Sequence, residues 1–140
     1  MITILGPTAS GKTSLAAALA ARIDAEIISA DSRQVYRGMT IGTGKDLDDY
    51  RQGDRLIPYH LIDICEPGTK YNLFQYQQDF HLIYNNIVAR GVRPILCGGT
   101  GLYIESVLKV TPCRPCHKTR HCVISWQTSR SPNSPKCLKT

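Results

Sequence analysis

The 140-residue sequence has no apolar run near the ~20 residues that cross a bilayer, and its last 30 residues contain no Asp or Glu. Met1 leads directly into Ile2–Leu5, with no basic segment and no signal-type cleavage site. We therefore expect a cytoplasmic protein without a membrane partner. Its length suits one modest domain with a single core.

Charge and cysteine divide the sequence into two parts. The net charge of +6 falls entirely in residues 111–140, which are rich in Pro, Ser and Cys, whereas residues 1–110 are balanced. Apolar periodicity also stops after Val110. These changes predict an α/β domain over residues 1–110 and a basic, disordered tail over 111–140. A shifted reading frame or a truncated gene would explain such a tail, and a family-like continuation in another frame of the DNA would support that hypothesis.

The tail contains one group of residues that resembles a zinc site: Cys113, Cys116, His117, His121 and Cys122. Cys and His at short spacing suit tetrahedral Zn²⁺. However, all five lie within ten residues, without the spacer of a zinc finger. We expect no zinc site, and we interpret the tail's cations as solvated, with weak RNA binding as the alternative.

Hydrophobic periodicity predicts alternating strands and helices. Strands are expected at Ile2–Leu5, Glu26–Ser29, His60–Ile64 and Arg93–Cys97, and helices from Lys12 to Ile23, from the N-cap Asn72 to Gly91, and over Leu102–Leu108. A short helix over Asp46–Gln52 is also possible. The first strand should be buried, because it is apolar and rich in β-branched residues. Strand–helix–strand units imply a parallel sheet flanked by helices, incomplete at its C-terminal end.

The first turn matches the P-loop pattern G-x-x-x-x-G-K-[ST], a nucleotide- or phosphate-binding motif. Backbone N–H groups of such a loop face phosphate oxygens, and the following helix adds its positive dipole end. The lysine supplies a charge, and the hydroxyl of Thr13 can reach Mg²⁺, the expected cofactor. The predicted phosphate-binding residues are Gly6, Pro7, Thr8, Ala9, Ser10, Gly11, Lys12 and Thr13. A P-loop alone indicates a P-loop NTPase-like fold without specifying the reaction.

Four sequence segments together limit the reactions that the chain could carry out. They are the P-loop, Asp31–Met39 with Ile41–Thr43, His60–Asp63, and Gly98–Tyr103. In order and spacing they resemble the tRNA dimethylallyltransferase (tRNA isopentenyltransferase) family, over residues 1–109. The resemblance implies transfer of a dimethylallyl group from dimethylallyl diphosphate to N6 of an adenosine beside the anticodon of tRNA. It also implies that the diphosphate, and not ATP, occupies the P-loop.

The resemblance further implies the roles of particular side chains. Asp31 corresponds to the general base and Thr100 to a residue near the reacting base, while Asp31, Ser32, Arg33, Gln34 and Thr100 would hold the tRNA adenosine. Asp31 could instead cap a turn, and Thr100 could be a turn hydroxyl. We expect a monomer. The alternatives are an ATP-dependent small-molecule kinase, an adenylate isopentenyltransferase and a non-catalytic fragment.

Overall fold

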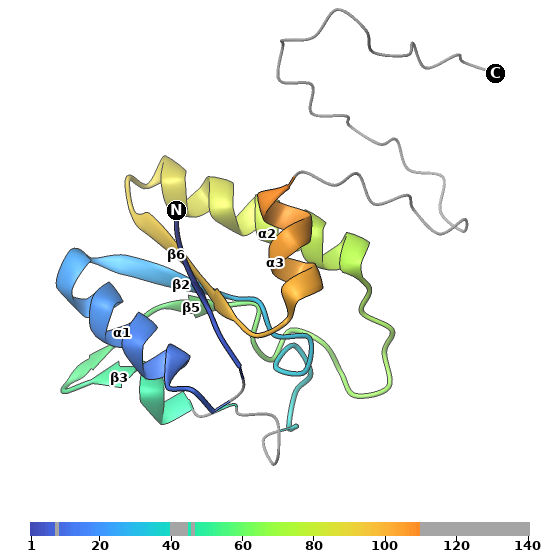
Figure 1. Cartoon of the computed structure of the whole chain (residues 1–140), viewed down its shortest axis with the longest axis horizontal. Coiled ribbons are helices and arrows are strands. Elements are labelled where there is room, and N and C mark those ends of the chain that lie inside the picture. Colours follow the sequence, from blue (N-terminus) through green and yellow to red (C-terminus); the bar gives the residue numbers. More distant parts are fainter. Residues whose placement is uncertain (8, 40–44, 46, 110–140) are drawn as a thin grey trace, which may run out of the picture.

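The computed structural model describes residues 1–7, 9–39, 45 and 47–109. Strands and helices follow one another along this part of the chain, with three short strands in succession between residues 51 and 60 (Figure 1). They are β1 (Ile2–Leu5), α1 (Lys12–Ile23), β2 (Ala25–Ser29), the 3-10 helix η1 (Leu47–Tyr50), β3 (Arg51–Gln52), β4 (Arg55–Leu56), β5 (Tyr59–His60), α2 (Leu73–Ala89), β6 (Arg93–Gly98) and α3 (Gly101–Leu108).

Four strands of the described part form a parallel sheet in the order β1-β6-β2-β5. The register pairs Ile4 with Cys97 across β1 and β6, and Ile27 with Ile95 across β2 and β6. The expected α/β fold with a parallel sheet is therefore confirmed. Because all four strands point the same way, the loops that follow them meet at one edge of the sheet.

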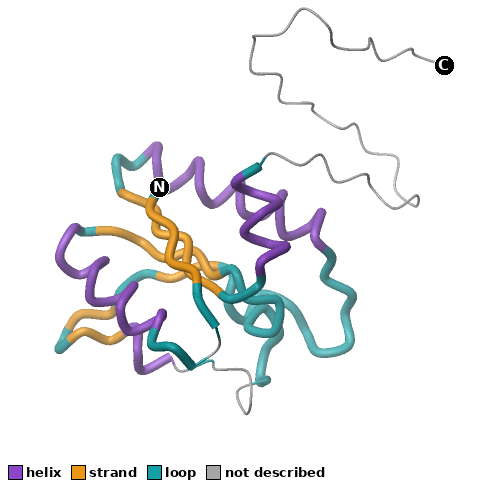
Figure 2. Tube along the Cα trace, viewed as in Figure 1, coloured by secondary structure: helices purple, strands orange, loops and turns teal. Residues whose placement is uncertain are grey.

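Helices cover both faces of the sheet (Figure 2). Alternate residues along β2 and β6 point to opposite faces, so each strand contributes to two apolar clusters. On the α1 face, Ala16, Ala17 and Ala20 are buried in one cluster with Ile27, Ile95 and Cys97. On the α2 and α3 face, Ile28 and Leu96 share a cluster with Tyr76, Phe80, Tyr103 and Ile104.

The ends of α2 match the sequence-based expectation. Asn72 accepts a hydrogen bond from the backbone N–H of Gln75, and the Gln75 side chain accepts one from the Asn72 N–H, which completes a capping box. Beyond the helix, Gly91 has φ 74°, and the N–H of Val92 donates to the carbonyl of Ile87. The predicted helix from Asn72 to Gly91 is confirmed.

The expectation of a buried first strand was wrong. Leu5 is 61% exposed and Ile2 is 38% exposed. Within the described residues β1 pairs with β6 on one side only, so its other side is an open edge. An apolar, β-branched strand ordinarily lies inside a parallel sheet, and the composition of Ile2–Leu5 therefore suggested burial that the edge position does not provide.

Two further predicted elements differ from the structure. The strand expected over His60–Ile64 is confined to Tyr59–His60, because Leu61 and Asp63 adopt left-handed backbone conformations with φ 62° and 55°. Of the helix expected over Asp46–Gln52, Asp46 lies outside the described residues, and the rest is limited to η1, which a hairpin of β3 and β4 follows.

Candidate active site

The P-loop joins β1 to α1 through two residues with left-handed backbone conformations. Ala9 has φ 61° and Gly11 has φ 76° immediately before α1. Gly6 leaves little room for a side chain, since an added Cβ would lie 3.1 Å from Ser10 Oγ. The tight turn expected from the sequence is present, although Thr8 lies outside the described residues.

The ammonium group of Lys12 lies over the loop. Its Nζ donates a hydrogen bond to the carbonyl oxygen of Pro7. Its charge also reaches Cys97 on β6: burial raises the pKa of that thiol to about 11, and the positive charge of Lys12 opposes this rise. Lys12 is thus positioned above the carboxyl end of the sheet, where a bound anion would be next to the first turn of α1.

Glycines bring three segments together at this edge. A Cβ on Gly98 would lie under 3.0 Å from the backbone of Ala30, and a Cβ on Gly99 would lie 3.4 Å from the carbonyl oxygen of Gly6. The Ala30 N–H donates to the carbonyl of Cys97 at 2.8 Å. The end of β6 is therefore in close contact with both the P-loop and the segment that carries Asp31.

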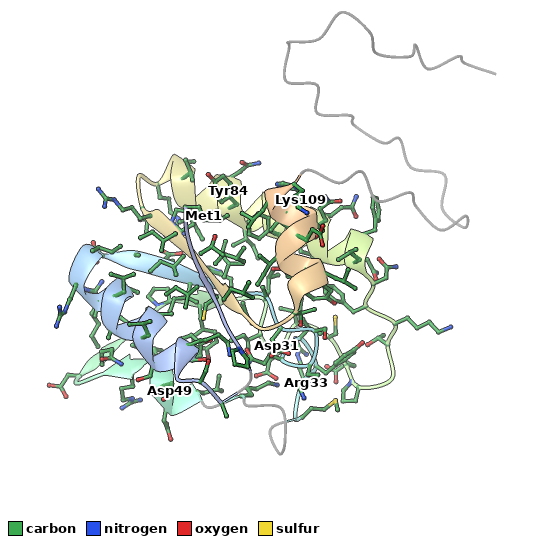
Figure 3. All side chains as sticks on the ribbon, in the orientation of Figure 1. Met1, Asp31, Arg33, Asp49, Tyr84 and Lys109 are labelled. Carbon is green, nitrogen blue, oxygen red and sulfur yellow. The ribbon has the colours of Figure 1, made fainter. Side chains whose placement is uncertain are left out.

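Thr100 and Ser32 meet across this junction, although they are 68 residues apart in sequence. The backbone N–H of Ser32 donates to Thr100 Oγ1 at 3.0 Å, and the Thr100 N–H donates to the carbonyl of Ala30 at 3.0 Å. Figure 3 shows Asp31 and Arg33 at the end of the sheet where α3 starts, far from Met1. The structure thus brings together the predicted residues Asp31, Ser32 and Thr100.

Asp31 forms the turn that the alternative interpretation anticipated. Its Oδ1 accepts a hydrogen bond from the backbone N–H of Arg33 at 2.9 Å, and the Arg33 Nε lies 3.8 Å from the same oxygen. A carboxylate has about four acceptor positions, so this bond leaves capacity for a further proton or hydrogen bond. The catalytic role of Asp31 stays a prediction.

Gln34 faces the interior of the protein. Its side chain is buried, and its Oε1 accepts the hydroxyl hydrogen of Ser29 at 3.0 Å. This bond ties the segment after Asp31 back to the end of β2. The predicted contact between Gln34 and a tRNA adenosine therefore stays a prediction, and a supporting role for Gln34 is what the geometry displays.

Two tyrosines support the site from the α2 and α3 side. Tyr76 is fully buried, and its hydroxyl donates to the carbonyl of Ser29 at 3.2 Å. Its ring stacks on Tyr103 with a centroid distance of 3.9 Å. Burial raises the pKa of Tyr103 to about 12, with Asp31 among the charges that add to the rise. The sequence does not single out Tyr76, because helical periodicity does not show which end of a strand a ring contacts.

Comparison with known proteins identifies the family. A model described as IPP transferase matches residues 34–133. The chain belongs to the IPP transferase family. A second family model, described as isopentenyl transferase, matches residues 1–60.

Named relatives agree with this family. Over 109 residues the chain is 71% identical to tRNA dimethylallyltransferase 1 of Parabacteroides distasonis, covering 78% of this chain and 36% of that protein. It is 68% identical to tRNA dimethylallyltransferase 2 of Bacteroides fragilis over the same length, again 78% and 36%. The chain thus spans about a third of the length of these relatives.

Solved structures show the same fold. The crystal structure of a tRNA isopentenylpyrophosphate transferase of Staphylococcus epidermidis superposes with a TM-score of 0.69 at 43% identity, covering 76% of this chain and 34% of that one. A full-length enzyme of this kind from Bacillus halodurans gives a TM-score of 0.68 at 37% identity, covering 81% and 37%. The family resemblance and the fold expected from the sequence are confirmed.

Two features are absent from the described residues. None of their helices has both the length and the apolar character needed to traverse a membrane. Nor do three or more His, Cys, Asp or Glu side chains gather there into a possible metal site. The tail, with Cys113, Cys116, His117, His121 and Cys122, lies outside the part of the chain that the structure describes, as do Ile41–Thr43. The division at residue 110 and the tail hypothesis stay predictions.

Proposed function

We propose that this chain carries the diphosphate-binding and adenosine-facing part of a tRNA dimethylallyltransferase. The observation that supports this most is the contact of the P-loop with the Gly98–Gly99 turn, which the Ala30–Ser32 segment also contacts. A diphosphate in the loop would then lie beside Asp31 and Thr100. The relatives are named for the same transfer to tRNA.

The reaction requires one bond to form and one to break at the allylic carbon. The exocyclic N6 of the adenosine attacks C1 of the dimethylallyl group, the C–O bond to the diphosphate breaks, and N6 loses a proton. Asp31 is the proposed acceptor of that proton, because it follows β2 at the edge of the sheet where ligands of open α/β folds bind. The target base must leave its stack to reach this pocket.

The departing pyrophosphate accumulates negative charge, and the P-loop is suited to stabilise it. The proposed contacts are the backbone N–H groups of residues 6–13, the first turn of α1 and the ammonium of Lys12. To bind the diphosphate, Lys12 would exchange its hydrogen bond to the Pro7 carbonyl for one to a phosphate oxygen. This exchange requires only rotation of a flexible side chain.

Mg²⁺ fits the donors of this site. Thr13 is the second residue of α1, next to Lys12, and its side chain is only partly exposed. A single hydroxyl next to a diphosphate suits Mg²⁺, which commonly binds few protein ligands and keeps several waters. When bound, Mg²⁺ would neutralise part of the diphosphate charge. The proposed role of Thr13 is to orient the ion.

Ser32 and Thr100 are the proposed contacts for the adenosine. The Thr100 hydroxyl already accepts the Ser32 N–H, and its oxygen lies 3.4 Å from Ser32 Oγ. This pair fixes two hydroxyls beside Asp31, where either could accept or donate to a purine edge. Arg33, whose side chain is about half exposed, could pair with an RNA phosphate.

A transfer assay tests this proposal against its alternatives. The purified chain is mixed with labelled dimethylallyl diphosphate and unmodified tRNA, with Asp31→Asn as the variant. Label that moves to tRNA only when Asp31 is present would support the proposal. Bound label without transfer would indicate a surviving pocket in an inactive fragment, and phosphate transfer from ATP would favour a kinase. A monomeric, cytoplasmic protein is part of the same proposal.

A further inference from the structure

Lys45 is buried in a way that is unusual for lysine. Its side chain is 0% exposed, whereas lysine side chains usually reach solvent. Its Nζ donates to two oxygens at 2.6 Å each, the backbone carbonyl of Tyr36 and Oδ1 of Asp63. A buried ammonium is costly unless it is paired and hydrogen-bonded, and here both conditions are met.

Asp63 binds the same segment through its backbone. Its N–H donates to the carbonyl of Gln34 at 3.0 Å, and its carbonyl accepts the Arg37 Nε at 2.8 Å. The left-handed conformation of Asp63, with φ 55°, lets both backbone groups and the carboxylate face the segment 34–37. This explains why the predicted strand over His60–Ile64 ends early.

Neighbouring residues extend this contact. The N–H groups of Ile64 and Cys65 both donate to the carbonyl of Val35 at 2.9 Å, and the Arg37 N–H donates to the carbonyl of Cys65 at 2.8 Å. Arg37 also pairs with Glu66 through Nη1 and Oε1 at 2.7 Å. The loop after β5 therefore holds the segment that directly follows Asp31, Ser32 and Arg33.

We propose that Lys45 and Asp63 are positioning residues for the adenosine side of the site. Together they form a clasp, defined as the Lys45 ammonium with the Asp63 carboxylate and the Tyr36 carbonyl. The clasp fixes the backbone at residues 34–37 and thereby keeps Asp31 and Ser32 against Thr100. This inference rests on the proposed function for its meaning, although the clasp itself can be tested without catalysis.

The geometry separates the clasp from the phosphate side. Lys45 is enclosed and already donates to two oxygens, so it is not available as a second phosphate-binding lysine. The P-loop is held instead by its contact with Gly99 and by α1. Removing the Lys45 ammonium leaves the Asp63 carboxylate and the Tyr36 carbonyl without this donor. The resulting increase in local opening should be confined to the two loops that the clasp joins.

Hydrogen exchange on Lys45→Met tests the clasp. The amides of Arg37, Asp63, Ile64 and Cys65 should exchange on the order of tenfold to a hundredfold faster than in the unmodified protein, because their hydrogen bonds join the two loops. Amides of α1 and β6 should keep their protection, and pyrophosphate affinity should not change. Lys109→Met is the matched control, since it removes a lysine whose ammonium is exposed and paired with Glu105.

A double variant adds a second criterion. If Lys45 acts through Asp63, the same amides should exchange at the same rate in the double variant Lys45→Met, Asp63→Asn as in Lys45→Met alone. Unchanged exchange in Lys45→Met would overturn the inference, as would faster exchange throughout the sheet with loss of pyrophosphate binding, which would indicate a general role in folding. An unmodified protein that binds no pyrophosphate would instead contradict the proposed function and leave the exchange comparison intact.

Discussion

Gly98 and Ala30 approach so closely that a single methyl group on Gly98 would lie under 3.0 Å from the Ala30 carbonyl oxygen, carbonyl carbon and Cα. These are backbone atoms, which cannot rotate away as a flexible side chain would. The end of β6 thus approaches the residue that follows β2 through main-chain atoms. The position of Asp31, the next residue after Ala30, depends on this contact.

Gly98→Ala should therefore destabilise the protein by about 1–3 kcal/mol or more, because β6 and β2 must separate to admit the methyl group. Chemical denaturation of the variant measures this cost. The control is Gly101→Ala in the first turn of α3, where an added Cβ has no atom within 4 Å. Equal stability of the two variants would contradict the close approach described here.

Lys12→Met should weaken pyrophosphate binding roughly tenfold to a hundredfold, the value of a hydrogen bond to a charged group, and leave the unfolding free energy nearly unchanged. The Lys12 ammonium lies over the P-loop and donates to the Pro7 carbonyl, so its loss should lower pyrophosphate affinity much more than it lowers the unfolding free energy. Calorimetric titration with pyrophosphate provides the measurement. Arg22→Met, in the last turn of α1, is the control for a lost cation on the same helix.

The open edge of β1 predicts that substitutions in the paired strands β1 and β6 differ in their cost to stability. Ile95→Ala should cost about 2–5 kcal/mol, because Ile95 is fully buried between α1 and the sheet. Leu5→Ala should cost less than about 1 kcal/mol, because the Leu5 side chain is mostly exposed. Urea unfolding of both variants checks the difference. A large cost at Leu5 would show that another part of the protein covers this edge.

A buried carboxylate near the amino end of β2 predicts a pH dependence. Two charge-assisted hydrogen bonds from Arg90, at 2.6 and 2.7 Å, hold the pKa of Glu26 below its ordinary value of 4.5. Burial of the carboxylate opposes this shift, and the hydrogen bond with His60, at 2.8 Å, adds to it. A depressed folded-state pKa contributes stability above pH 4.5 that is lost as the pH falls through the folded-state value.

Glu26→Gln should accordingly be less stable than the unmodified protein at neutral pH, and the difference should shrink as the pH falls below 4.5. Denaturation over a series of acidic buffers gives the comparison. Glu105→Gln, which alters an exposed pair with Lys109, should show little difference at any pH. A stability difference between Glu26→Gln and the unmodified protein that widened in acid would contradict the assigned direction of the Glu26 pKa shift.

Local signals in the sequence predicted much of this fold correctly. The P-loop turn, α1 and the capped α2 depend on residues adjacent in sequence, such as Gly11 before Lys12 and Asn72 before Gln75. The family resemblance predicted that Asp31 and Thr100 belong to one site. The hydrogen bond between Ser32 and Thr100 shows that the segment after Asp31 and Thr100 lie at the same edge of the sheet.

The errors concern properties that depend on distant partners. The exposure of β1 is decided by which strands pair with it, and four residues of sequence contain no such information. The left-handed Asp63 is stabilised by Lys45 and by the backbone of Gln34, which lie 18 and 29 residues away. The hairpin of β3 and β4 could have been predicted, because Gly53 occupies a two-residue loop with φ 63°.

The unpaired edge of β1 also determines where a further strand could join this sheet. Between β5 and β6 the chain passes through α2 on one face and advances across β2 toward β1. α3 packs on that same face, and crossovers between parallel strands are almost always right-handed. A parallel strand added after α3 would therefore be directed past β6 to the far side of β1, with Ile2 and Leu5 becoming interior residues.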